Sequence, residues 1–186
     1  MRVLFGASGL AIISYAAPVP LRRDTISTVR PSKLTLKLTT KSLDHFIPRS
    51  YIRDEKLRLG AYRQLAGTED EQELDSILRS LEDRYGPGPA QLDNLAYSLR
   101  VKLRGQRMGL RGVVAEGYDI VIRVDPQRFL DVEELTRRMP GRFTVAPNRL
   151  KMRRQGEGWQ QDLLRLLDEM AELYESARTA VVAQGH

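Results

Sequence analysis

The stretch ILRSLEDRYGPGP, residues 77–89, ends one helix and begins another within a few positions. Gly86 is free to adopt the positive φ that closes a helix, and Pro87 and Pro89 cannot continue one. Pro89 also suits the first turn of a following helix. The apolar residues before this corner recur at helical spacing, which predicts one buried helix face: Leu74, Ile77, Leu78, Leu81 and Tyr85.

Asp83 and Arg84 lie in the last turn before the corner, and the hydrophobic repeat requires neither of them. In a local interpretation, Arg84 binds the C-terminal carbonyls while Asp83 pairs along the helix with Arg79 or Arg84. In the second interpretation, Asp83 and Arg84 are a charged patch offered to a partner protein, where charge pairs set register and discrimination. The residues alone leave both interpretations open.

A second helix precedes this one, and its capping signals lie on both sides of it. Asp54 is a candidate N-cap for a helix that runs to about residue 66 and is closed by Gly67. Thr68 with Glu71 three residues later matches a capping box for the next helix. We expect the inward face of the first helix to consist of Leu57, Ala61, Tyr62 and Leu65.

The remaining patterns predict an α+β fold, because helices and antiparallel strand pairs come in blocks. We expect three consecutive helices, a β-hairpin, a short helix, a second strand pair and a long C-terminal amphipathic helix packed on a small, mostly antiparallel sheet. The segments predicted after the corner are a helix over 89–107, a hairpin over 111–124, a helix over 131–139, strands over 143–146 and 149–153, and a helix from Trp159 onward; residues 33–41 read as a short strand.

Length and charge suggest one domain with a separate leader. The chain has 186 residues and a net charge of +6. Residues 1–56 hold ten Lys/Arg against four Asp/Glu, whereas the rest holds twenty of each, so the excess belongs to the entry segment. We expect residues 1–32 to be a flexible basic leader or fragment remnant, rather than a secretory signal, and residues 33–186 to be the folded domain.

Catalytic and metal-binding motifs are missing from the sequence. It has no cysteine, which is compatible with a reducing compartment, and only two histidines, His45 and His186. Neither histidine belongs to a zinc motif or accompanies a serine nucleophile elbow, and no phosphate-binding glycine-lysine loop is present. We therefore expect no enzymatic activity, no metal, no cofactor and no small-molecule substrate.

Two groups of basic residues have competing interpretations. Arg100, Arg104, Arg107 and Arg111 would form one stripe on a continued helix, either as a track for nucleic-acid phosphates or as a solvated face. No aromatic residue is interleaved to stack on bases, which favours the solvated face. The second group lies on a predicted strand, where charge protects an exposed sheet edge from unwanted pairing: Arg149, Lys151, Arg153 and Arg154.

Two segments resemble the C-terminal domain of bacterial transcription-repair coupling factor. The first runs Ile47-Pro48-Arg49-Ser50-Tyr51-Ile52, followed by Asp54, Leu57-Arg58-Leu59 and Tyr62-Arg63. The second, Asp83-Arg84-Tyr85-Gly86-Pro87 with Pro89, resembles the domain's Asp-Arg-aromatic-Gly-Pro-x-Pro signature. The resemblance runs from about Leu34 to Val124 and more loosely to Ala177.

The resemblance implies a regulatory function in transcription-coupled DNA repair. In that family this domain docks on the coupling factor's own excinuclease-B-like module, hides the surface that recruits the excinuclease-A protein, and restrains the DNA-translocating motor until RNA polymerase is engaged. Its Asp-Arg pair lies in the docking contact and corresponds to Asp83 and Arg84. The resemblance also implies a cytoplasmic protein without membrane contact. The alternative function is nucleic-acid binding through the arginine stripe.

The sequence departs from the family in two respects. Ser80 stands where the family usually has glutamate, three residues before the aspartate, so part of the docking contact differs. The family's motor does not precede the domain in these residues. A fragment, a truncated reading frame and a free-standing relative are all compatible with that absence.

Overall fold

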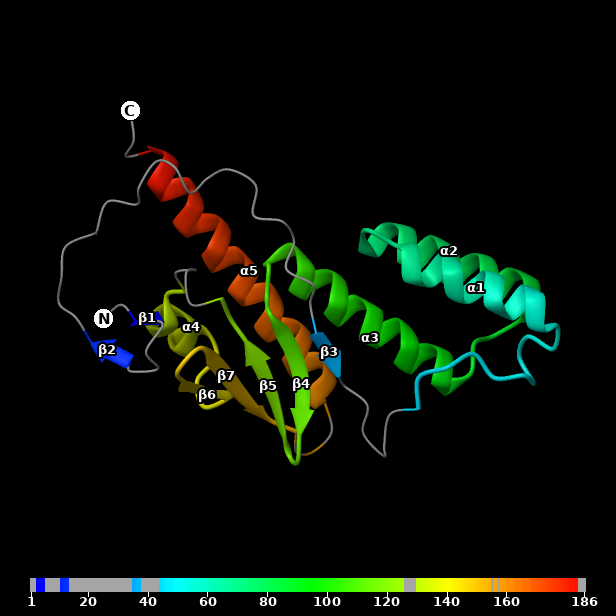
Figure 1. Ribbon diagram of the computed structural model, residues 1–186, viewed down its shortest axis with the longest axis horizontal. Coiled ribbons are helices and arrows are strands. Elements are labelled where there is room, and N and C mark those ends of the chain that lie inside the picture. Colours follow the sequence, from blue (N-terminus) through cyan, green and yellow to red (C-terminus); the bar gives the residue numbers. More distant parts are fainter. Residues whose placement is uncertain are drawn as a thin grey trace. The chain divides into compact units, whose positions relative to one another are not determined.

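The computed structural model describes residues 3–5, 11–13, 35–37, 44–125, 130–154, 156 and 158–183 (Figure 1). The chain divides into two compact units. A helical unit comprises Leu38–Leu103, and a sheet-containing unit comprises Met1–Lys37 with Arg104–His186. Most of the predicted leader, residues 1–32, lies outside the described residues; within it, β1 (Val3–Phe5) and β2 (Ala11–Ile13) form an antiparallel pair.

The three consecutive helices that the sequence predicts are α1 (Glu55–Gly67), α2 (Glu71–Tyr85) and α3 (Ala90–Arg107), and the helical unit contains α1, α2 and α3 as far as Leu103. The Asp54 side chain caps α1 by accepting a hydrogen bond from the Leu57 N–H at 2.9 Å. Burial of one face of each helix holds the unit together. Its buried core consists of Ile47, Ile52, Ala61, Leu65, Leu74, Leu81, Leu92 and Leu103.

The capping box predicted at Thr68 and Glu71 is wrong by two residues. Asp70 is the N-cap of α2 and accepts a hydrogen bond from the Glu73 N–H at 2.8 Å, while the Glu73 carboxylate accepts one from the Glu69 N–H at 3.0 Å. Thr68 instead closes α1: it is buried, and its hydroxyl donates to the Leu65 carbonyl at 2.9 Å. Both spacings satisfy the capping pattern, but the burial of Thr68 assigns it to the preceding helix.

The inward orientation predicted for Leu57 is also wrong. Leu57 is 51% exposed, whereas Ala61 and Leu65 are buried. Helical spacing places residues on one face, but it does not specify which turns of that face meet the core. Here the buried part of α1 begins one turn after Leu57.

The sheet unit contains the α+β core, and its strand order is β3 (Thr35–Lys37), β4 (Gly112–Glu116), β5 (Asp119–Arg123), β7 (Arg149–Arg153) and β6 (Phe143–Ala146). β4, β5, β7 and β6 pair antiparallel, and β3 adds to β4 in parallel. The prediction of a mostly antiparallel sheet is therefore confirmed.

Helix α5 (Trp159–Ala183) lies along one face of this sheet (Figure 1). Alternate residues of β5 and β7 point toward it and are buried, as are four residues at helical spacing on α5. The sheet residues are Ile120, Ile122, Leu150 and Met152; the helix residues are Leu163, Leu166, Leu167 and Met170. Within the part of the chain that the structure describes, no helix is both long and apolar enough to cross a membrane.

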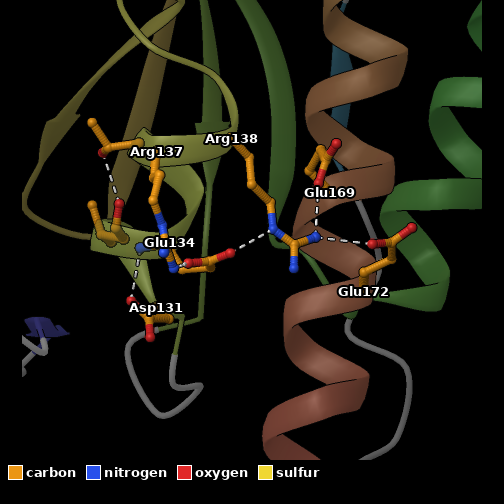
Figure 2. Close-up of polar contacts among 8 residues, drawn as sticks. Asp131, Glu134, Arg137, Arg138, Glu169 and Glu172 are labelled. Atoms are coloured by element: carbon orange, nitrogen blue, oxygen red, sulfur yellow. Dashed lines mark hydrogen bonds and ion pairs between the residues drawn. The ribbon is translucent and has the colours of Figure 1, made fainter.

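The short helix α4 (Val132–Arg138) is fastened to α5 by an ion-pair network (Figure 2). Arg138 Nε donates to Glu134 at 2.8 Å, and Arg138 Nη1 donates to both Glu169 and Glu172 of α5 at 2.9 Å. Arg137, which is 77% exposed, pairs only with Glu134 among the described residues. One guanidinium thus contacts three carboxylates on two helices.

We expect Arg138→Gln to lower the unfolding temperature measured by circular dichroism, because three neighbouring carboxylates would then repel one another. The loss should shrink when salt is raised from about 0.1 M to about 1 M, since screening weakens that repulsion. Arg137→Gln is the matched control and should have little effect. Equal losses in the two variants would show that Arg138 does not hold α4 on α5.

Candidate protein-docking site

The corner between α2 and α3 forms where the sequence predicts it. α2 ends at Tyr85, and Gly86 has a φ of 85°, which a residue with a side chain rarely adopts. The Gly86 N–H donates to the Glu82 carbonyl at 2.8 Å and so completes the last turn of α2. The Pro89 carbonyl accepts a hydrogen bond from the Leu92 N–H at 2.8 Å, at the start of α3.

Tyr51 ties a distant segment to this corner. Its hydroxyl donates to the Gly86 carbonyl at 2.9 Å, and its ring meets the Tyr85 ring at a centroid distance of 5.8 Å and a tilt of 58°. Ile47 and Ile52, on either side of Tyr51, are buried in the core of the helical unit. The two segments that carry the family resemblance, about 35 residues apart in sequence, are therefore in contact.

Burial raises the pKa of Tyr51 above its ordinary value, and the nearby carboxylates of Glu82 and Asp93 raise the pKa further. The folded domain thus favours the neutral phenol, which is the form that donates to Gly86. Local sequence patterns assign no role to Tyr51, because its partners are distant in sequence.

Asp83 and Arg84 are both exposed on the last turn of α2. Among the described residues, neither side chain makes a hydrogen bond or an ion pair, so the structure lacks the local partners that the first interpretation requires. Arg84 borders a surface hollow of about 260 Å³, lined also by Gln64, Ser76, Ile77, Ser80 and Leu81. The small Ser80 side chain precedes Arg84 by one helical turn and leaves space beside the guanidinium.

The predicted arginine stripe is largely neutralised. Arg100 binds Asp75 at 2.6 Å, Arg104 binds Asp168 at 3.0 Å, and Arg111 lies 3.4 Å from Asp125. Arg107 is the last residue of α3, and the positive φ of Gly109 (64°) lies between it and Arg111. Arg111 is therefore not on the helix, and a single four-residue stripe does not form. These ion pairs favour the interpretation as a locally satisfied face.

The described residues include no cluster of three or more His, Cys, Asp or Glu side chains that could hold a metal ion. The notable arrangement in the helical unit is a different one: two opposite charges are displayed on a fixed corner, beside a hollow. This arrangement suits contact with charged groups of another protein.

Residues 42–135 match the TRCF domain family, and this match covers half of the chain. The chain belongs to the TRCF domain family. The matched residues include both segments that Tyr51 joins. They end within α4, so β6, β7 and α5 lie outside the matched part.

Curated relatives of this TRCF domain are full-length transcription-repair-coupling factors. The protein from Mycobacterium bovis is 31% identical over 119 residues, which is 61% of this chain and 10% of that protein. The Rickettsia bellii protein is 28% identical over 100 residues, 54% of this chain and 9% of that protein. The chain thus spans about a tenth of the length of these relatives.

A solved structure extends the likeness in fold beyond the matched residues. The crystal structure of the C-terminal domain of transcription-repair coupling factor superposes with a TM-score of 0.61 at 18% identity. It covers 77% of this chain and 94% of its own. The α+β arrangement of the TRCF domain is therefore common to both chains.

We expect Tyr51→Phe to destabilise this TRCF domain by about 1–2 kcal/mol in denaturant unfolding, because the Gly86 carbonyl loses its donor while the ring is kept. The pH dependence should change as well. The pKa of Tyr51 is higher in the folded domain than in the unfolded chain. This difference stabilises the wild-type fold fully below about pH 10, and the stabilisation disappears as the pH rises through the folded-state pKa. Tyr51→Phe should lack that alkaline loss.

Tyr118→Phe is the control for this measurement, since Tyr118 is 75% exposed. It should leave both the stability and the alkaline profile unchanged. If Tyr51→Phe behaves like Tyr118→Phe, the hydroxyl of Tyr51 does not support the corner.

Proposed function

We propose that this TRCF domain is a non-catalytic regulatory domain of transcription-coupled DNA repair. It docks through Asp83 and Arg84 on the excinuclease-B-like module of a transcription-repair coupling factor, and thereby masks the surface that recruits the excinuclease-A protein. The observation that carries the proposal is the exposure of two opposite charges, without ion-pair partners among the described residues, at a corner that Tyr51 fixes.

The rigidity of the corner favours docking. Groups already held in place lose little conformational entropy on binding, so more of their interaction energy appears as affinity. The backbone at Gly86 is held by hydrogen bonds on both sides, from its N–H to Glu82 and from Tyr51 to its carbonyl. Asp83 and Arg84 lie three and two residues before Gly86, in the last turn of α2, so the two charges keep a defined register toward the partner.

The hollow beside Arg84 offers a partner side chain a recess to occupy, next to the positive charge of Arg84. It combines polar groups of Gln64, Ser76 and Ser80 with the apolar Ile77 and Leu81. A partner side chain that ends in a carboxylate would meet the Arg84 guanidinium while its methylene groups contact the apolar residues. Because Ser80 carries no charge, Asp83 is the residue we assign to bind a partner cation.

The rest of the family's mechanism belongs to the full-length coupling factors. In the proposal, this domain restrains a motor that displaces stalled RNA polymerase from DNA, and it meets the excinuclease-A protein, polymerase and DNA only through that coupling factor. A cytoplasmic location is part of the same proposal. Whether the docking is intramolecular depends on the polypeptide that contains the domain.

We predict that Arg84→Glu weakens binding to the excinuclease-B-like module of the coupling factor from the same genome by about tenfold to a hundredfold. A reversed charge would face the partner's carboxylate, and an unpaired charge in a desolvated contact costs a few kcal/mol. Isothermal titration calorimetry measures the effect directly.

Arg79→Glu is the matched control, since Arg79 is exposed on the same helix, five residues away and on a different face. It should bind nearly as wild type does. Wild-type affinity in Arg84→Glu would remove Arg84 from the contact. An equal loss in both variants would show that net charge, rather than this corner, governs the association.

A further inference from the structure

Strand β7 carries a row of cations on one face of the sheet. Arg149, Lys151 and Arg153 alternate with Leu150 and Met152, which are buried beneath α5. Because successive residues of a strand point to opposite faces, the three cations lie on the face away from α5. α4 lies on the same side as α5, to which Arg138 binds it, so neither helix covers the cationic face (Figure 1).

The interpretation of these charges as protection for an exposed sheet edge is wrong. β7 pairs with β5 on one side and with β6 on the other, so it is an interior strand. Its backbone groups already have partners in both directions, and charges there do not serve to block further pairing. The row therefore needs another explanation.

The three cations are available to a ligand. Arg149 and Arg153 are exposed and Lys151 is half-buried, and none of the three side chains makes a hydrogen bond or an ion pair within the residues that the structure describes. The neighbouring Arg123, by contrast, binds Glu116 at 3.0 Å. Arg149 lies directly opposite Arg123 in the sheet, and like charges in that position are destabilising. Arg153, at the other end of the row, lies directly opposite Asp119.

An exposed aromatic residue lies close to one end of the row. Tyr118 is in the turn between β4 and β5 and is 75% exposed. The N–H of Arg154, which follows β7, donates to the Tyr118 carbonyl at 2.7 Å. The Arg154 guanidinium also donates to the Gly117 carbonyl at 3.3 Å and lies 5.9 Å from the centre of the Trp159 ring. The turn is therefore held beside the end of β7.

We propose that this face binds a single strand of nucleic acid, with phosphates along Arg149, Lys151 and Arg153 and a base stacked on Tyr118. Cations along a flat surface beside an aromatic side chain form the combination that single strands bind. On the side of the unit that carries α5, by contrast, the arginines pair with acids: Arg104 with Asp168, and Arg138 with Glu169 and Glu172. The residues of this face are distinct from Asp83 and Arg84 and from the arginines of α3.

The test is fluorescence anisotropy of the full chain with a labelled oligodeoxythymidine at several salt concentrations. Three neutralised phosphates predict a slope of about −2 in log affinity against log salt, or about a 20-fold loss between roughly 50 and 200 mM. Replacing Arg149, Lys151 and Arg153 by alanine should abolish most of that slope and weaken binding about tenfold or more at low salt. Tyr118→Ala should weaken binding about fivefold or more and leave the slope unchanged.

The control replaces Lys56, Arg63 and Arg79 by alanine, which removes the same net charge from exposed positions of the helical unit. It should bind as wild type does, and all variants should keep the wild-type circular dichroism spectrum. Equal losses in both triple variants would overturn the proposal in favour of general electrostatics. Equally tight binding of polyglutamate would instead assign the face to an acidic protein, and no binding at low salt would exclude the strand.

Discussion

The hydrogen bond from Tyr51 to the Gly86 carbonyl, together with the contact of the Tyr51 and Tyr85 rings, is the constraint on which the helical unit depends. A glycine and two prolines force α2 to end, but such a corner still permits many directions for the next helix. Tyr51 selects one of them. Because Ile47 and Ile52 anchor its segment in the core, the corner is fixed by tertiary structure rather than by its own residues.

The structure sorts the basic residues into two groups that sequence alone does not separate. Arg100, Arg104 and Arg138 are bound to carboxylates and contribute to the fold. Arg84 and the row on β7 are without such partners among the described residues and face outward. Exposed cations without a partner have most of their interaction energy available for a ligand, whereas paired ones would first have to give up an existing contact.

Much of the fold could be predicted because its elements follow local periodicity. The apolar repeat that ends at Tyr85 and the hairpin around Gly117 needed no tertiary information. Thr68 was misassigned because two overlapping capping patterns fit, and only burial distinguishes them. The interior position of β7 was not predicted, because β6 pairs with the outer side of β7 and local sequence does not encode strand order. Asp83 and Arg84 were singled out by their position at the end of α2, and the family resemblance then implied a docking role, which stays a prediction; the role of Tyr51 depends on a contact across 35 residues.

A double-mutant cycle between Tyr51 and Tyr85 tests most directly whether the two segments act as one structural element. Unfolding free energies of Tyr51→Leu, Tyr85→Leu and the double variant would be measured in denaturant. Our account predicts a coupling energy of about 0.5–1.5 kcal/mol, as expected for an aromatic pair in contact. Losses that add to within about 0.3 kcal/mol would contradict it, because the corner would then be independent of the segment around Tyr51.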